Sequence, residues 1–224
     1  MKAMILAAGR GERMRPLTDH VPKPLLPVAG KPLMQYHIDA LAAGGVRDIV
    51  INLAWLGSSI REALATGAAS GVRIQYSDEG DAALETGGGI FNALELLGDG
   101  PFIVVSGDVW SDFPLAQLTT RLHPQDLAHF VMVANPDYHQ RGDFGLRDGR
   151  IVAEGERLTY ANIGVFRREF FAGCTGGKFP LAPLMRERIA AGKVSGEFHA
   201  GRWFNVGTPQ QLADLDANLR RERS

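Results

Sequence analysis

The sequence has a single cysteine, Cys174, among its 224 residues. One thiol excludes a disulfide framework and a thiolate metal cluster, and it fits a reducing compartment. No apolar run approaches the ~20 residues of a membrane helix, and the short apolar start does not have the pattern of a signal peptide. We therefore expect a cytoplasmic protein with no membrane partner.

The sequence also lacks a strong charge of either sign. Its 24 lysines and arginines oppose 25 aspartates and glutamates, for a formal net charge of −1. No overall field favours nucleic acid as a partner, so any polyanionic ligand must be bound by local groups. The hydrophobic content of 45% allows one full core, and we expect one domain spanning 1–224.

Several catalytic and phosphate-binding patterns are missing as well. The six histidines have no metal-ligand spacing, and no nucleophile with a partner histidine indicates covalent catalysis. A dinucleotide-binding fingerprint would need glycine where Met14 stands, and no Walker A Gly-Lys-Ser/Thr is present.

The most informative segment is the first eighteen residues. The apolar run 3–8 has strand length and continues directly into Gly9-Arg10-Gly11-Glu12-Arg13-Met14-Arg15. A buried strand that ends in glycine is typical of the carboxyl edge of an open α/β sheet, where ligands bind. Glycines let backbone N–H groups approach an anion, and arginines add permanent charge. The structural alternative is a glycine turn with solvated arginines.

Strand and helix signals alternate over the first half. Strands are expected at 48–53, 72–76 and 102–105, with helices beginning at Pro32, at a Ser59-x-x-Glu62 capping box and near Ile90. This order predicts a parallel sheet built from βαβ units. Beyond Asp112 the alternation decays into short strand candidates that predict antiparallel additions, before a final helix capped by Thr208.

Three side chains outside the first loop are candidates for anion or metal chemistry. Lys23 lies among three prolines that stiffen its backbone, so its ammonium is pre-positioned for a phosphate. Asp108 follows the most apolar strand and is placed to hold Mg²⁺, with Asn205 as a second oxygen donor. The alternatives are an exposed loop lysine, an Asx turn or cap, and a turn asparagine.

Four segments, in order, resemble the signature segments of sugar-1-phosphate nucleotidylyltransferases: residues 6–18, 22–27, 107–108 and 205–209. The first is highly specific, and the resemblance extends from Lys2 to about Leu219. Segments 84–89 and 159–164 are most similar to a bacterial uridylyltransferase branch.

The resemblance implies an α/β, Rossmann-like nucleotidyltransferase fold. Its central sheet would be mostly parallel and flanked by helices, with a small antiparallel sugar-binding annex. Residues 1–112 would form the nucleotide-binding half and 113–207 the mainly sugar-binding half, followed by a C-terminal helix at 208–224.

The reaction implied by the resemblance is Mg²⁺-dependent. A sugar 1-phosphate oxygen attacks the α-phosphorus of UTP in line, and pyrophosphate leaves; such chemistry depends on positioning and charge stabilisation. At matching positions, Arg15 would stabilise the leaving pyrophosphate, Lys23 would bridge the two phosphates, and Asp108 with Asn205 would carry Mg²⁺. Nucleotide contacts are implied for Ala7, Ala8, Gly9, Arg10, Gly11, Glu79, Thr86, Gly87 and Gly88, and sugar contacts for Gly145, Glu154 and Asn162.

Two positions depart from the family's pattern. Many members have aspartate where Asn205 stands. The Glu-Lys-Pro motif, whose lysine often contacts the sugar phosphate, is absent from 153–158, where Arg157 is the candidate substitute.

Two other functions are open. A transferase for another base and sugar, such as a mannose-1-phosphate guanylyltransferase, would share these motifs. A catalytically silent nucleotide-sugar sensor could keep the fold, but Arg15, Lys23 and Asp108 are all present, which favours catalysis. No assembly module follows the last motif, and we expect a monomer.

Overall fold

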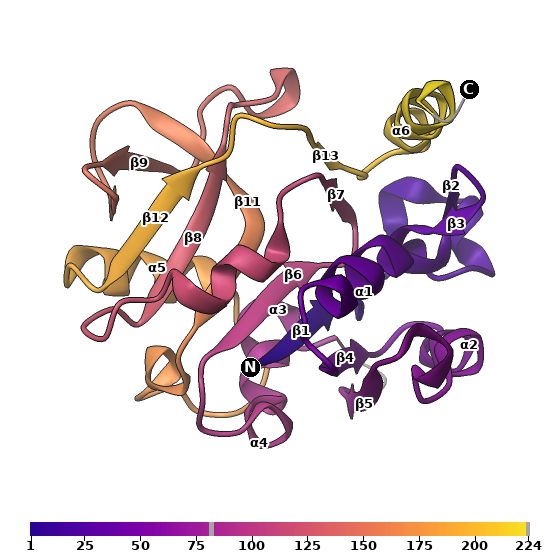
Figure 1. The fold of residues 1–224 in the computed structure, drawn as a ribbon, viewed down its shortest axis with the longest axis horizontal. Coiled ribbons are helices and arrows are strands. Elements are labelled where there is room, and N and C mark those ends of the chain that lie inside the picture. Colours follow the sequence, from indigo (N-terminus) through magenta and orange to yellow (C-terminus); the bar gives the residue numbers. More distant parts are fainter. Residues whose placement is uncertain (81–82, 223–224) are drawn as a thin grey trace.

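The computed structural model describes residues 1–80 and 83–222. A nine-stranded sheet of order β5-β4-β1-β6-β11-β8-β12-β10-β9 runs through the molecule (Figure 1). Its first-half strands are β1 (Lys2–Leu6), β4 (Asp48–Leu53), β5 (Arg73–Asp78) and β6 (Phe102–Ser106). All neighbours within this group pair in parallel, which confirms the predicted βαβ sheet.

The second half extends the same sheet. It contributes β8 (Ala128–Val133), β9 (Phe144–Arg147), β10 (Arg150–Val152), β11 (Arg157–Phe166) and β12 (Val194–Phe198). Strand β11 pairs antiparallel with both β6 and β8, whereas β12 runs parallel to β8. The α/β class is therefore confirmed, but the sheet is mixed and not mostly parallel, because the second-half strands pair antiparallel except for β12 with β8. The antiparallel part is continuous with the parallel part because β11 joins the two halves.

Two small ribbons complete the strands. β2 (Pro27–Val28) pairs with β3 (Lys31–Pro32), and β7 (Val109–Ser111) pairs with β13 (Trp203–Asn205). Residues 194–204 are thus divided between two sheets, because the chain leaves the large sheet after β12 and crosses to β7.

The helices are α1 (Leu33–Ala43), α2 (Gly57–Leu64), α3 (Glu85–Asn92), α4 (Leu94–Leu97), α5 (Leu181–Ala190) and α6 (Pro209–Arg221). The 3₁₀ turns are η1 (Glu12–Met14), η2 (Leu17–Asp19), η3 (Lys23–Leu25), η4 (Ala68–Ser70), η5 (Leu115–Thr120), η6 (Asp137–His139) and η7 (Arg168–Phe171). No helix in the described ranges is long and apolar enough to span a bilayer.

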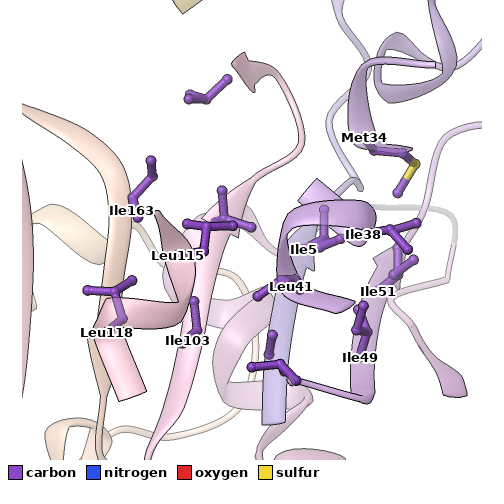
Figure 2. Close-up of a cluster of buried hydrophobic side chains, with 14 of the residues drawn as sticks. Ile5, Met34, Ile38, Leu41, Ile49, Ile51, Ile103, Leu115, Leu118 and Ile163 are labelled. Carbon is purple, nitrogen blue, oxygen red and sulfur yellow. The ribbon is translucent and has the colours of Figure 1, made fainter. Parts of the chain in front are cut away.

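The alternation of side chains along the strands separates two cores. Ile5, Ile49 and Ile51 pack with Ile38 and Leu41 of α1 on one face (Figure 2). On the other face, Met4, Val50 and Val104 pack against α3, α4 and α5. Strands buried on both faces explain the continuous apolar runs in the sequence.

Two predicted helix starts are wrong. Ser59 lies inside α2, which begins at Gly57, and no side-chain hydrogen bond caps that helix. The predicted helix near Ile90 begins at Glu85 and contains the glycine run. A Cβ on Gly87 would lie 2.5 Å from the Phe179 ring, and one on Gly88 would lie 2.2 Å from the Gly177 carbonyl oxygen. These glycines therefore permit close packing of α3.

The predicted start of α6 is confirmed. Thr208 Oγ1 accepts a hydrogen bond from the Gln211 backbone at 3.3 Å, and Pro209 occupies the first turn. Leu215 and Leu219 are buried in a third core cluster with Met14 and Leu33. The last two residues of the predicted 208–224 segment lie outside the described ranges.

Candidate active site

The carboxyl ends of β1 and β6 meet at the site. The Gly107 backbone donates a hydrogen bond to the Leu6 carbonyl at 2.9 Å. A Cβ on Gly107 would stand only 2.8 Å from that oxygen, so glycine is needed for the contact. This close approach holds Asp108 beside the loop that follows β1.

The first loop has one glycine with a strict structural requirement. Gly11 has φ 65°, and a Cβ there would lie 3.0 Å from Thr18 Cγ2 and 3.2 Å from Lys23 Cβ. Its carbonyl accepts a hydrogen bond from Thr18 Oγ1 at 2.9 Å. Gly9, in contrast, is exposed with open space around it, which leaves its backbone accessible to a ligand.

Lys23 and Asp108 form an ion pair at this edge. Lys23 Nζ lies 2.6 Å from Asp108 Oδ2, and the two side chains are 10% and 31% exposed. Pro22 and Pro24 flank the lysine in η3 and are buried, which fixes where its side chain begins. The Lys23 ammonium and the Asp108 carboxylate are thus positioned next to each other at the carboxyl edge of the sheet.

Asn205 lies next to Asp108. The pairing of β13 with β7 sets Asn205 opposite Val109, and the Val206 backbone donates to the Asp108 carbonyl at 2.8 Å. The side-chain oxygen Oδ1 of Asn205 is buried and has no hydrogen-bond partner within the described residues. An orphaned buried acceptor requires an explanation, and a bound cation provides one.

The donor chemistry fits Mg²⁺, which prefers a few carboxylate or amide oxygens and shares the rest of its shell with substrate phosphates and water. Asp108 and Asn205 are such donors. Within 1–80 and 83–222 no group of three or more His, Cys, Asp or Glu residues could hold a metal, so a Mg²⁺ site would use this mixed pair.

Two aromatic side chains border the pair. His37 of α1 donates through Nε2 to the Val109 carbonyl at 2.7 Å, and burial lowers the pKa of His37 to about 4, so the ring is neutral at pH 7. Partial burial raises the pKa of Tyr138 in η6, although its interaction with the Asn205 backbone opposes that shift. Tyr138, from the second half of the chain, therefore lies next to the candidate metal ligand Asn205.

Two adjoining cavities open at this edge and share Leu6 and Thr86. The smaller, of about 240 Å³, contains Lys23 and Asp108 and the predicted residues Ala7, Ala8, Gly9, Gly11, Glu79 and Thr86. The larger, of about 880 Å³, contains Asn205, Asn162, Tyr138 and Arg157. The structure therefore brings most of the predicted nucleotide contacts together and places the two candidate metal ligands where the cavities meet.

Three predicted nucleotide contacts and the predicted catalytic residue Arg15 do not line either cavity. The guanidinium of Arg10 lies over the Trp55 ring at 5.1 Å. Arg15 Nε lies 2.6 Å from Asp19 Oδ1, with the arginine side chain 69% exposed. Gly87 and Gly88 are buried beneath the 177–179 segment.

Of the predicted sugar contacts, only Asn162 lines the larger cavity. It has φ 57° and lies where the register of β11 against β8 shifts, a local irregularity that often marks a functional position. Gly145 pairs with Val152 and Arg157, and a Cβ on it would meet the Glu154 carbonyl at 2.7 Å, so its glycine is explained by strand packing. The Glu154 residue is exposed.

Asn52 is a site residue that was not predicted from the sequence. This buried side chain accepts a hydrogen bond from the Ala7 backbone at 2.7 Å and donates to Glu79 Oε1 at 2.6 Å. Glu79 Oε2 accepts from the Leu84 backbone at 2.7 Å. An asparagine in the otherwise apolar β4 was the available signal, because buried polar groups need partners.

Known proteins resemble this chain in sequence and in fold. A family model described as nucleotidyl transferase matches residues 2–155. The chain belongs to this family. It is 49% identical over 225 residues to N-acetylmuramate alpha-1-phosphate uridylyltransferase from Neisseria meningitidis serogroup B, with 97% of each chain covered.

A second relative of the same name, from Caulobacter vibrioides, is 37% identical and covers 97% of this chain and 96% of its own. A solved structure from Bacillus anthracis, assigned to the glucose-1-phosphate thymidylyltransferases, superposes with a TM-score of 0.88 at 20% identity, covering 98% and 95% of the two chains. The protein is therefore an enzyme, a sugar-1-phosphate nucleotidyltransferase, and its resemblance to the uridylyltransferase branch is confirmed.

Proposed function

We propose that this nucleotidyltransferase transfers UMP from UTP to N-acetylmuramate α-1-phosphate. The products would be UDP-N-acetylmuramate and pyrophosphate, and the reaction would serve peptidoglycan recycling in the cytoplasm. The observation that carries the proposal is the 49% identity to the Neisseria uridylyltransferase across 97% of both chains.

The two cavities give the substrates separate places. UTP fits the smaller one, where Ala7, Ala8, Gly9 and Gly11 present backbone to the nucleotide. Glu79 and Asn52 form its rigid wall, because each is held by hydrogen bonds to backbone as well as to the other. The sugar phosphate fits the larger cavity, with Asn162 facing the sugar.

Lys23 lines the smaller cavity beside Asp108. Its ammonium can contact both the α-phosphate and the attacking phosphate, which reduces their mutual repulsion. The attacking oxygen forms the new P–O bond as the bond between the α-phosphorus and the bridging oxygen breaks, so the charge moves to pyrophosphate. This displacement needs neither a protein nucleophile nor a net proton transfer.

Asp108 and Asn205 would hold Mg²⁺, which when bound neutralises charge developing on the phosphate oxygens. Arg15 is proposed to stabilise the leaving pyrophosphate. Its present partner Asp19 forms only an exposed i,i+4 pair, and such pairs are weak enough to exchange for a phosphate.

A substrate panel tests the proposal. UTP, GTP, CTP and ATP are each combined with N-acetylmuramate, N-acetylglucosamine and mannose 1-phosphates, and pyrophosphate release is followed with Mg²⁺ and after EDTA. We expect UTP with N-acetylmuramate α-1-phosphate to be preferred and EDTA to abolish turnover. Preference for GTP with mannose 1-phosphate would support the guanylyltransferase alternative, and no turnover with any pair would support the sensor.

We also propose that the enzyme works as a monomer of 24.3 kDa. Light scattering during gel filtration measures this directly, and a mass twice as large at working concentration would contradict it.

A further inference from the structure

The larger cavity collects arginines whose side chains have no partner among the described residues. Most arginines in the described ranges form side-chain hydrogen bonds or ion pairs, as Arg73 does with Asp48 and Arg150 with Asp126. The side chains of Arg13, Arg141, Arg157 and Arg186 make no hydrogen bond or ion pair within residues 1–80 and 83–222, and all four residues line this cavity.

Acidic groups do not balance these charges. Asp143 is the carboxylate among the described lining residues. Its Oδ2 accepts from the Tyr160 backbone at 2.8 Å, and its Oδ1 lies 3.1 Å from His139 Nε2. Since Asp143 is already engaged, the cavity carries uncompensated positive charge, which favours an anionic ligand.

The four arginines come from two places. Arg13 is at the metal side, because a Cβ on Gly207 would lie 3.0 Å from its Nη2 and its charge acts on Tyr138. Arg141 precedes β9, Arg157 begins β11, and Arg186 lies on α5. Figure 1 shows β9, β11 and α5 at the same end of the molecule, away from β2, β3 and α6.

Arg186 has no carboxylate one turn away on its own helix. It projects from α5, where Leu181, Ala182 and Met185 also line the cavity. The residues one turn away on this helix are Ala182 and Ala190, so no carboxylate is available to it at i±4.

A sugar with a phosphate as its single anionic group would bind the cations near Asp108 and Asn205. Arg141, Arg157 and Arg186 would then have no anionic partner. N-acetylmuramate has a second anionic group, the carboxylate of its 3-O-lactyl ether, which N-acetylglucosamine lacks. Arginine is well suited to carboxylates because its planar guanidinium can form two parallel hydrogen bonds.

We propose that Arg141, Arg157 and Arg186 bind the lactyl carboxylate and so determine selectivity for N-acetylmuramate over N-acetylglucosamine. This inference rests on the proposed function. It assigns the distal arginines to the sugar's acid, while Lys23 and Arg13 remain for phosphate groups.

The test compares three acceptors with UTP: N-acetylmuramate α-1-phosphate, its lactyl methyl ester and N-acetylglucosamine α-1-phosphate. The ester keeps the bulk of the lactyl group without its charge. The variants are Arg141→Gln, Arg157→Gln, Arg186→Gln and the triple variant. Arg147→Gln is the matched control, because Arg147 is also exposed and unpaired within the described residues but does not line the cavity.

We expect the ratio of kcat/KM for the acid to that for N-acetylglucosamine to fall by about tenfold to a hundredfold in at least one single variant and further in the triple variant, the range typical of a lost hydrogen bond to a charged group. The two acceptors without the lactyl carboxylate should change little, and Arg147→Gln should resemble wild type. Unchanged Tm values would confirm intact folding.

Two results overturn the inference while leaving the proposed function in place. The ratio could stay unchanged in the triple variant although wild type uses the acid, or all three acceptors could lose turnover equally, which would assign the arginines to the shared phosphate. If wild type does not use N-acetylmuramate α-1-phosphate at all, both the function and the inference fail.

Discussion

The ammonium nitrogen of Lys23 lies 2.6 Å from Asp108 Oδ2, although 85 positions separate the two residues in the chain. The pair means that each side chain orients the other before any ligand arrives. It also means that a cation entering at Asp108 competes with Lys23, which would then turn toward phosphate. A substitution at either position therefore also changes the environment of the other residue.

Replacing Asp108 should separate metal binding from stability. We expect Asp108→Ala and Asp108→Asn both to reduce kcat by a hundredfold or more, on the order expected for lost charge stabilisation. Only the alanine variant should lose stability, by roughly 1–3 kcal/mol, because it leaves a buried ammonium without an acceptor. Steady-state kinetics and urea unfolding measure the two effects, and full activity in Asp108→Asn would refute the metal assignment.

Replacing Lys23 should impair the chemical step. Loss of one pre-positioned charge typically removes ~3 kcal/mol of transition-state stabilisation, so Lys23→Ala should lower kcat/KM by roughly a hundredfold. Lys31→Ala is the control, because Lys31 pairs with Asp39 and lines neither cavity. Equal losses in the two variants would show a general charge effect instead.

Asn205 should set the metal requirement. We expect Asn205→Ala to raise the Mg²⁺ concentration for half-maximal turnover by about tenfold, and Asn205→Asp to lower it, since a carboxylate is a stronger Mg²⁺ ligand than an amide. Asn218→Ala serves as control, because Asn218 pairs with Arg221 on the surface of α6. A Mg²⁺ titration that is identical in all four proteins would remove Asn205 from the site.

Asn52 should matter for both folding and nucleotide binding. Asn52→Ala leaves the Ala7 N–H and Glu79 Oε1 without their partner, which should lower the free energy of unfolding by about 1–3 kcal/mol. KM for UTP should rise more than KM for the sugar phosphate, because Asn52 lines only the smaller cavity. Equal rises in both KM values would indicate a general loss of structure.

His37 should make folding sensitive to acid. Its pKa of about 4 in the folded state lies below the ordinary value of 6.5, so the unfolded chain binds the proton more readily between these values. Stability from this group is complete above pH 6.5 and falls by about 3 kcal/mol as pH approaches 4. Urea unfolding from pH 7 to 4.5 should show a weaker decline in His37→Gln than in wild type; parallel curves would contradict the assignment.

The sequence by itself determined the parallel half of the sheet, because long apolar runs broken by glycine and proline permit few other structures. It also indicated Lys23 and Asp108, since a proline-stiffened lysine and an aspartate after a buried strand are local features. The helix start predicted near Ile90 failed because the glycine run packs against the distant 177–179 segment inside α3, which no local pattern shows. The predicted start at Ser59 failed because α2 begins at Gly57 without a side-chain cap.

Tertiary structure decided what depends on distance between remote residues. Only the folded chain shows that Asn52 joins Ala7 to Glu79, and that Asn205 has a buried oxygen without a partner in the described part of the chain. It also gathers Arg141, Arg157 and Arg186 around one cavity. Strand period and motif spacing are set by neighbours along the chain. Cavities and hydrogen-bond partners arise from pairings between strands that are far apart in the chain, such as β6 with β11 and β7 with β13, which no local pattern records.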